Sequence, residues 1–306
     1  MKKMLLTGAS GFLGWNICRW AGKGWEIYGT VFSHPIQIPG VKIVQVDLRD
    51  FREVKKIFDV VRPDAVVHTA AAANINFCQT HPKESHQINV DVSMDIAGLC
   101  ADRSIACVFT SSDLVFDGQC APYCEEDPVS PVNVYGEQKI LAEEGMLKRY
   151  PDVIICRMSL MFGDPGPVAS SFVQPMIAAM REARPLKLFV DEFRTPLSGR
   201  DAAAGIFLAL KKAKGILHLG GRERISRYEI GVLLRDILGF TEKKAALISC
   251  RQRDVHMPAP RAADVSFDIT KAQTLGFHPV SLPEALKDFT SFENRLPSAT
   301  AETAIF

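Results

Sequence analysis

The feature that most constrains the fold of this chain is a regular alternation of short apolar runs with helical patterns. Residues 2–8, KKMLLTG, form an apolar run that ends in glycine, residues 11–24 have helical spacing, and residues 25–32 again resemble a strand. Strands that alternate with helices pair in parallel, because each crossover helix returns the chain to the same end of the sheet. The sequence therefore predicts an α/β fold, a doubly wound parallel sheet with helices on both faces.

The same alternation continues along the first half of the chain. Further strands are expected at residues 41–47, 64–70, 105–112 and 152–158, and further helices at residues 50–63, near 84–103 and in the segment 131–144. After Gly163 the pattern is less regular, with helices expected near 172–183, 199–215, 226–238 and 282–289 and a strand at 216–220. We predict that this second half adds a smaller α/β lobe over the carboxyl ends of the strands.

The composition argues against several classes of partner. The 306 residues include 36 basic and 35 acidic side chains, so the totals contain no charge excess that would indicate nucleic acid or an anionic membrane surface. No apolar run approaches the roughly 18 residues of a membrane span, and the apolar stretch near Met1 is too short for a signal peptide. We therefore expect a cytoplasmic protein that acts on a small polar ligand, without nucleic-acid or membrane partners; a homodimer is left open.

The eight cysteines do not form a metal-binding pattern. They include no CxxC pair and have no histidine-rich neighbour, so we expect no metal site. Several lie in apolar runs, where a free thiol packs as a small core residue. Cys120 and Cys124 are close enough in sequence to form a redox pair, although cytosolic thiols are usually reduced.

A glycine cluster directly follows the first predicted strand. The segment TGASGFLG places Gly8, Gly11 and Gly14 between this strand and the first helix, where a βαβ unit holds a pyrophosphate at a helix N-terminus. Glycine is needed there because a side chain would keep phosphate away from the backbone N–H groups. Tight packing of the strand against the helix is the alternative explanation. The position of the turn favours a dinucleotide, with Asp47 and Leu48, at the end of the third strand, bordering its adenine.

These patterns predict two structural units. Residues 1–165 are expected to form a dinucleotide-binding domain, which residues 199–222 rejoin. Residues 166–198 and 223–295 are expected to form the substrate-binding lobe. The last residues, 296–306, are expected to be a loose tail.

The helix expected in PVNVYGEQKILAEE carries a second chemical signal. Tyr135 and Lys139 are four residues apart, so their side chains share one helical face and can converge on one point. A phenol with an unperturbed pKa of about 10 exchanges protons poorly at neutral pH, and a nearby ammonium ion favours the phenolate. The pair is therefore suited to move a proton to or from a carbonyl oxygen during hydride transfer with a nicotinamide.

Four segments, taken in order, carry a resemblance to a known family. TGASGFLG, HTAAA, TSSDLVFDG and NVYGEQKILAEE resemble the extended short-chain dehydrogenase/reductases, the superfamily of the NAD-dependent epimerases and dehydratases, and within them the dTDP-4-dehydrorhamnose reductase branch. The resemblance implies a Rossmann fold and catalytic roles for Ser112, Tyr135 and Lys139. It also implies a cofactor site made of Gly8, Ser10, Gly11, Phe12, Leu13, Gly14, Asp47, Leu48, Ala70, Ala71, Tyr135 and Lys139. For Ser112, a strand-end hydroxyl that caps its own turn is the alternative.

The same resemblance implies a nucleotide-linked keto sugar as substrate. Arg194 and Arg261 are candidates to bind its diphosphate, because a guanidinium group matches two phosphate oxygens with parallel hydrogen bonds; a surface salt bridge is the alternative for Arg261. The chain departs from the branch at Leu160, where an aromatic residue is usual, and at Asn76 and Phe77, where an acid and a lysine are common. Arg194 itself replaces a glycine of the branch. We therefore expect a sugar pocket that differs from the typical one.

Three functions are compatible with these features. The leading interpretation is an NAD(P)-dependent oxidoreductase that reduces the keto sugar of a nucleotide sugar by hydride transfer, with Tyr135 as acid/base. One alternative is a cofactor-binding regulatory subunit of the methionine adenosyltransferase type, which this family also contains, and another is a nucleotide-sugar epimerase. Dehydratase chemistry is disfavoured because no glutamate follows Asp113.

The choice of cofactor is inferred from an absence. NAD-selective folds carry an acid that accepts a hydrogen bond from the ribose 2′-OH, but no acid stands between Glu26 and Asp47. Ser33 and His34 are able to donate to a 2′-phosphate instead, although an exposed serine and histidine without such a role are the alternative. We therefore favour NADP(H) over NAD(H).

Overall fold

The computed structural model describes residues 1–293, and a seven-stranded parallel sheet forms the centre of this part of the chain. Its strands are β1 Lys2–Thr7, β2 Trp25–Val31, β3 Val41–Gln45, β4 Ala65–His68, β5 Ala106–Ser112, β6 Ile154–Met158 and β11 Ile216–Leu219. The spatial order is β11-β6-β5-β4-β1-β2-β3, and all neighbours are parallel. The chain therefore builds outward from β1 in one direction and then from β4 in the other, which confirms the predicted doubly wound sheet. Ligands of such sheets bind at the carboxyl ends of the strands where the direction changes.

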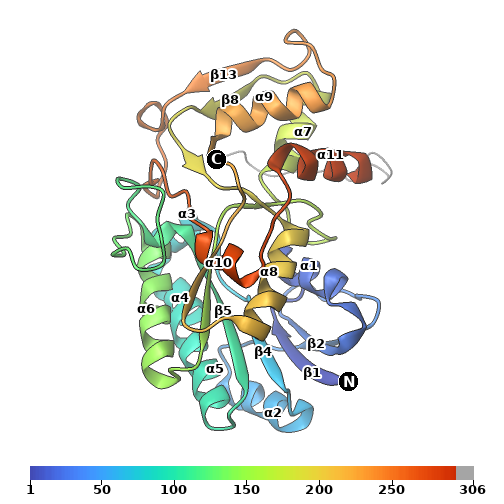
Figure 1. Ribbon diagram of the computed structural model, residues 1–306, viewed down its shortest axis with the longest axis vertical. Helices are drawn as coiled ribbons and strands as arrows, with labels where there is room; N and C mark the ends of the chain where they lie inside the picture. Colours follow the sequence, from blue (N-terminus) through green and yellow to red (C-terminus); the bar gives the residue numbers. More distant parts are fainter. Residues whose placement is uncertain (294–306) are drawn as a thin grey trace.

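Helices cover both faces of the sheet (Figure 1). They are α1 Phe12–Trp20 and α8 Gly199–Lys212 on one face, and α2 Phe51–Val61, α5 Val92–Ala101 and α6 Val134–Arg149 on the other. Successive strand residues point to opposite faces, so Leu5 packs in the core beneath α2, α5 and α6 while Leu6 packs beneath α1 and α8. Burial on both faces explains why the strands read as continuous apolar runs rather than as alternating ones.

Side-chain caps fix where several of these helices begin. Asn133 accepts a hydrogen bond from the backbone N–H of Gly136 at 3.0 Å and so starts α6. Ser198 accepts in the same way from Asp201 at 3.0 Å and starts α8. The cap of α6 places Tyr135 in the first turn of that helix, beside the carboxyl end of β5.

The helix predicted near residues 84–103 is interrupted. It consists of α4 Pro82–His86, a π-helical segment Gln87–Asp91 and α5, and a short helix that the sequence did not predict, α3 Ile75–Thr80, precedes it. Inside the π-helical segment, the side chain of Asn89 accepts from the N–H of Ala72 at 2.8 Å and donates to Gln138 Oε1 at 2.9 Å. This bulge therefore ties the loop after β4 to α6, which is a common use of π-helical segments near functional sites.

Most of the remaining elements form a smaller α/β group beyond the carboxyl ends of the central strands (Figure 1). They are β7 Met161–Phe162, α7 Val173–Arg181, β8 Leu186–Phe189, β9 Phe193–Arg194, β10 Leu197–Ser198, β12 Ile225–Ser226, α9 Arg227–Ile237, β13 Leu247–Cys250 and α11 Leu282–Glu293, with a 3₁₀ turn at Gln252–Asp254. The helix α10 Thr270–Leu275 packs instead against β11 of the central sheet, and two further 3₁₀ turns lie between α1 and β2, at Gly22–Gly24, and after β5, at Asp113–Val115. The parallel pair β8 and β13 packs with α7, α9 and α11 around a core of its own.

Two elements from the second half of the chain return to the central sheet. α8 and β11 lie with the central sheet, where the prediction puts residues 199–222. The boundaries of the two units remain our proposal. The predicted loose tail, 296–306, lies outside the described residues. Within residues 1–293, no helix is both long and apolar enough to cross a membrane.

Candidate active site

The turn between β1 and α1 is shaped by main-chain contacts. Gly8 has a φ of +72°, and a Cβ on it would lie 2.9 Å from the backbone of Ala70. A Cβ on Gly14 would lie only 2.1 Å from the carbonyl oxygen of Gly8. No side chain caps α1 at Gly11, so the first N–H groups of this helix have no side-chain partner. The turn thus has the form that accommodates a pyrophosphate at a helix N-terminus.

Two cavities meet at this turn. The outer cavity, of about 320 Å³, is lined among others by the predicted cofactor residues Gly8, Ser10, Gly11, Asp47, Leu48, Ala70 and Ala71. The central cavity, of about 590 Å³, is lined among others by Gly11, Phe12, Leu13, Gly14, Ala71, Ser112, Tyr135, Lys139, Arg194 and Arg261. Gly11, Thr69 and Ala71 line both. The structure therefore brings every residue predicted for catalysis, for the glycine turn, for the adenine and for the diphosphate to one of two adjoining cavities, and the roles of these residues stay predictions. Ser33, considered as a donor to a 2′-phosphate, lines the outer cavity, but His34 lines neither.

Ser112 and Lys139 come from neighbouring elements at the centre of the larger cavity. Ser112 ends β5, and its Oγ donates to Asp113 Oδ1 at 3.1 Å and accepts from the N–H of Leu114 at 3.2 Å. This serine therefore caps its own turn and also lines the cavity. Lys139 Nζ donates to the carbonyl oxygen of Thr110 at 2.9 Å and lies 5.7 Å from the centre of the Tyr135 ring.

Burial dominates the ionisation of Tyr135 and Lys139. Burial, and then the charge of Asp113, raise the pKa of Tyr135 above its ordinary value, while a hydrogen bond with Ser112 lowers it. Burial also lowers the pKa of Lys139 to about 8, against the opposing effect of Glu143. In the protein alone, Lys139 is not among the groups that lower the pKa of Tyr135, and the effect of Lys139 on the phenolate stays a prediction.

Sequence reasoning missed a buried charged cluster beside Ser112. Arg194 Nε lies 3.5 Å from Asp113 Oδ2, and Arg194 Nη2 lies 3.6 Å from Glu192 Oε1. Arg227 Nε donates to Glu192 Oε1 at 3.0 Å. All four residues line the central cavity. The sequence held one signal for this cluster, the acid two positions before Arg194, but no local pattern pointed to Arg227.

The cluster changes the ionisation of both of its carboxyl groups. Burial raises the pKa of Asp113, although Arg194 opposes this. Burial alone would also raise the pKa of Glu192, but Arg227, Arg194 and Arg261 together outweigh it and lower the pKa to about 2. Glu192 is therefore a permanent negative charge at neutral pH.

A second residue that the sequence did not single out lies in the outer cavity. Arg49 donates to both carboxylate oxygens of Asp47, with Nη2 to Oδ2 at 2.7 Å, and lowers the pKa of this acid. The Arg49 guanidinium also lies 5.4 Å from the centre of the Phe32 ring. Asp47 is therefore neutralised by a cation that lines the same cavity.

Comparison with known proteins agrees with this geometry. A model of the RmlD substrate binding domain matches residues 1–293. The chain belongs to the RmlD family. One relative, the probable low-salt glycan biosynthesis reductase Agl14 of Haloferax volcanii, is 26% identical over 300 residues, which cover 94% of this chain and 99% of the relative. Another, methionine adenosyltransferase 2 subunit beta of Bos taurus, is 27% identical over 283 residues, covering 90% of this chain and 83% of the relative.

A solved structure extends the comparison in three dimensions. The dTDP-4-dehydrorhamnose reductase of Bacillus anthracis, in complex with NADP, matches with a TM-score of 0.82 and 20% identity, over 95% of this chain and 100% of that one. At this identity the match demonstrates the shared fold. The shared fold agrees with the resemblance in the sequence motifs.

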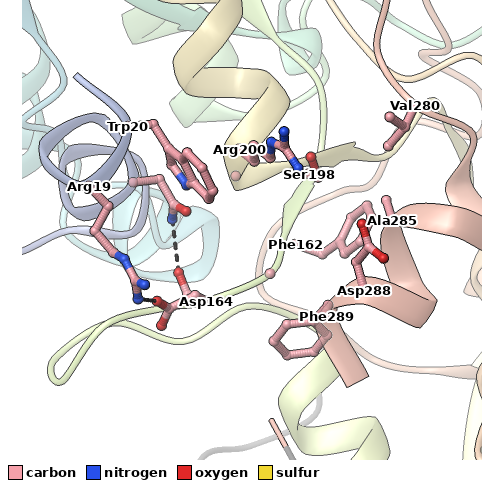
Figure 2. Close-up of a pocket in the computed structure, with 13 residues that line it drawn as sticks. Arg19, Trp20, Phe162, Asp164, Ser198, Arg200, Val280, Ala285, Asp288 and Phe289 are labelled. Atoms are coloured by element: carbon pink, nitrogen blue, oxygen red, sulfur yellow. Dashed lines mark hydrogen bonds and ion pairs between the residues drawn. The ribbon is translucent and has the colours of Figure 1, made fainter. Parts of the chain in front are cut away.

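A third cavity of this RmlD-family chain, of about 220 Å³, lies between α1, the start of α8 and α11 (Figure 2). On its α1 side, Asp164 accepts from Trp15 Nε1 at 3.1 Å and pairs with Arg19, and its carbonyl oxygen accepts from Asn16 at 2.8 Å. No residue predicted for the site lines it. We interpret these contacts as an anchor that holds the loop after β7 to the helix of the glycine turn.

The cysteines are not paired with one another. All eight are free thiols, with Cys120 exposed and Cys124 partly buried. Within residues 1–293, no group of three His, Cys, Asp or Glu side chains is placed to hold a metal ion.

Proposed function

We propose that this member of the RmlD family is an NADP(H)-dependent reductase that acts on a keto sugar carried by a nucleotide. The observation that carries the proposal is the meeting of Ser112, Tyr135 and Lys139 in one cavity beside the glycine turn. Two similar proteins, a probable glycan biosynthesis reductase and a dTDP-4-dehydrorhamnose reductase, support the same reaction class.

The two cavities fit a nicotinamide dinucleotide. The backbone around Gly8 and Gly14 leaves no room for side chains, and the N-terminus of α1 offers its N–H groups to a pyrophosphate. Asp47 and Leu48 in the outer cavity would hold the adenosine half, and Tyr135 and Lys139 in the central cavity would hold the nicotinamide half. When bound, the cofactor supplies the hydride for carbonyl reduction.

The side chains of the central cavity transfer a proton to the carbonyl oxygen of the sugar and stabilise the charge on it. Tyr135 donates its proton to the carbonyl oxygen of the sugar as the hydride arrives. Ser112 turns its hydroxyl from Asp113 toward the same oxygen and stabilises the negative charge that develops there. Lys139 binds the nicotinamide ribose through its ammonium group and, once a ligand reorganises this buried region, favours ionisation of Tyr135.

The outer cavity favours NADP(H) over NAD(H). An acid selects NAD(H) by accepting from the 2′-OH and by repelling a 2′-phosphate. Asp47 is engaged by Arg49 in two hydrogen bonds, so its charge is compensated. Ser33 and Arg49 line the cavity as donors, and both suit a phosphate group.

A second candidate function is supported by one relative. Methionine adenosyltransferase 2 subunit beta is similar to 90% of this chain, and its name is that of a subunit rather than of a reductase. A chain of this kind binds a protein partner and need not turn over a sugar. The two candidates differ in whether the reduced cofactor is consumed.

Turnover with keto sugars tests the choice. The purified protein is incubated with NADPH or NADH and a panel of nucleotide-linked 4-keto sugars, and loss of the reduced nicotinamide is followed by absorbance. We expect oxidation with at least one sugar and a preference for NADPH of about tenfold. Binding of both cofactors without turnover of any sugar would favour the regulatory-subunit candidate. A comparable preference for NADH would reverse the cofactor assignment.

A further inference from the structure

We propose that His68 is a positioning residue for the cofactor, and that it acts as a neutral ring with its hydrogen on Nε2. His68 is the first residue of the segment HTAAA, and its side chain is fully buried and lines neither of the two cavities. It therefore acts through its neighbours rather than by contact with a ligand. The identity of the ligand rests on the proposed function, but the state of the ring can be measured without any ligand.

The four residues after His68 form a wall of the cofactor cavities. Residues 69–72, called here the wall segment, all line the outer cavity, and two of them, Thr69 and Ala71, also line the central one. The backbone of Ala70 packs so closely against Gly8 that a Cβ on this glycine would lie 2.9 Å away. A shift of the wall segment would therefore change the space that is left for a pyrophosphate beside the glycine turn.

The hydroxyl group of Thr7 holds the beginning of the wall segment. Its Oγ1 accepts from the N–H groups of Thr69 at 3.1 Å and Ala70 at 3.2 Å, and it lies 2.7 Å from His68 Nδ1. A hydroxyl group has two acceptor sites and one hydrogen. Because backbone N–H groups only donate, they occupy both acceptor sites, and the hydroxyl hydrogen must point to His68 Nδ1. This nitrogen therefore carries no hydrogen and accepts.

The other ring nitrogen is connected to the end of the wall segment. His68 Nε2 lies 3.0 Å from Ser93 Oγ, which donates to the carbonyl oxygen of Asn89 at 2.8 Å. Since the serine hydrogen is used in this bond, Nε2 must carry a hydrogen and donate it to Ser93. The side chain of Asn89 in turn accepts from the N–H of Ala72 at 2.8 Å. Both sides of the network therefore require the same tautomer, and His68 joins the two groups that hold the wall segment.

The surroundings of the ring keep it uncharged. A second hydrogen, on Nδ1, would face the Thr7 hydroxyl, whose two acceptor sites are taken. Besides Thr7 and Ser93, the ring packs against Phe109, with 5.6 Å between the ring centres. The charged group that acts on the ring is the ammonium of Lys139. Burial, and then this ammonium, lower the pKa of His68 to about 3, so the ring is neutral at pH 7.

Nuclear magnetic resonance of the full-length protein, labelled with ¹⁵N, tests the state of the ring. Long-range ¹H–¹⁵N correlation distinguishes a ring nitrogen that carries a hydrogen from one that does not. Ser93→Ala removes the partner of Nε2 and so assigns the signals of His68. We expect the hydrogen on Nε2 at pH 7. A hydrogen on Nδ1, or a charged ring, would overturn the proposal.

Two substitutions of His68 test its positioning role. His68→Asn places an acceptor oxygen near the position of Nδ1 and so keeps a partner for the Thr7 hydroxyl, whereas His68→Gln places its amide nitrogen near Nε2 and leaves this hydroxyl without an acceptor. By isothermal titration, we expect the Kd of NADP⁺ to rise by about tenfold in His68→Gln and to stay within about threefold in His68→Asn. The KM of NADPH should change in the same way, with kcat within a few-fold of the wild type in both variants.

A second buried histidine provides the matched control. His218 is also fully buried and lines neither cavity, so His218→Gln should lower stability without changing the Kd of NADP⁺. Equal losses of affinity in His68→Gln and His218→Gln would overturn the positioning role, because they would reflect general destabilisation. If substitution of His68 prevents folding, Ser93→Ala replaces it as the test, since it removes one oxygen and leaves the ring in place. We expect this variant to raise the Kd by about threefold, and wild-type affinity would overturn the proposal.

The positioning role and the proposed function can fail separately. If the wild type reduces a nucleotide sugar and His68→Gln keeps its KM for NADPH, the positioning role is wrong and the function stands. If the Kd of NADP⁺ rises in His68→Gln and recovers in His68→Asn, but no keto sugar is reduced, the positioning role stands and the reductase assignment fails.

Discussion

In the turn between β1 and α1 the groups that face the cavities are main-chain atoms, whereas at the substrate end of the central cavity they are guanidinium and carboxylate groups. The first region excludes side chains by contact, as at Gly14, where a Cβ would lie 2.1 Å from a carbonyl oxygen. The second region is selective through charge, with Glu192 kept ionised by three arginines. The first region is therefore sensitive to added volume, and the second to removed charge.

The two regions also differ in where their parts come from. The glycine turn is built within a few residues of sequence, between the end of β1 and the start of α1. The charged cluster joins the end of β5, the strand β9, the first residue of α9 and the loop that contains Arg261. A local motif describes the first, while the second exists only after the substrate lobe has packed over the sheet.

The largest expected effect is that of Tyr135→Phe, which should impair the chemical step without impairing binding in either region. Tyr135→Phe keeps the ring in its buried position and removes only the oxygen that transfers a proton. We expect kcat to fall by about 10²- to 10⁴-fold while the Kd of the cofactor stays within a few-fold. Steady-state kinetics and cofactor titration measure the two quantities. Tyr150→Phe, at the end of the same helix and outside both cavities, is the control. Near-normal kcat in Tyr135→Phe would refute the acid/base assignment.

The next effect tests whether the glycine turn depends on main-chain contact. Gly14→Ala introduces a Cβ that would collide with the Gly8 carbonyl, so the turn must shift. We expect the affinity for the cofactor to fall by at least about tenfold, with a loss of about 1–3 kcal/mol in the free energy of unfolding. Gly24→Ala, where no atom lies within 4 Å of the added Cβ, should behave as the wild type. Equal cofactor affinity in both variants would contradict this comparison.

The smallest effect concerns pH and Lys139, whose pKa burial lowers to about 8. Its ammonium form prevails below this pH and its neutral form above it, so kcat/KM should fall by about fivefold between pH 8 and pH 9. Lys139→Met should have a low kcat/KM without this decline. If the decline persists in Lys139→Met, another group is responsible.

Unfolding does not account for the expected loss of activity above pH 8. The pKa of Lys139 is lower in the folded state, about 8, than its ordinary value of 10.5, so between these values the unfolded chain binds more protons. The contribution of Lys139 to the free energy of unfolding therefore rises with pH in this window. Urea titrations at pH 8 and pH 9 separate the two effects.

Much of the fold could be read from the sequence because its signals are periodic. The strands and helices of the central sheet lie where the apolar runs indicated, apart from the unpredicted α3 and the π-helical segment at Gln87–Asp91. The π-helical segment contains Asn89, whose hydrogen bonds to Ala72 and Gln138 join distant segments. Such contacts leave no local pattern.

The sequence predicted the residues at the cofactor end of the site better than those of the charged cluster. The residues named from the glycine turn, from Ser112 and from the Tyr135 helix all line the two adjoining cavities, and their roles await the experiments above. Arg194 was singled out as a diphosphate ligand, but the structure shows its guanidinium engaged by Asp113, Glu192 and two carbonyl groups. Arg227 was not singled out, although it lines the cavity and donates to Glu192.

The sequence by itself determined the parallel sheet, the shape of the glycine turn and the common helical face of Tyr135 and Lys139. Each of these depends on residues that are close along the chain, so spacing and residue type are sufficient. Only the tertiary structure decided that burial raises the pKa of Tyr135 and lowers that of Lys139. It also decided which buried arginine nitrogen atoms are left without a hydrogen-bond partner. Desolvation and ion pairing depend on what packs around a group, and those neighbours come from elements far apart in sequence.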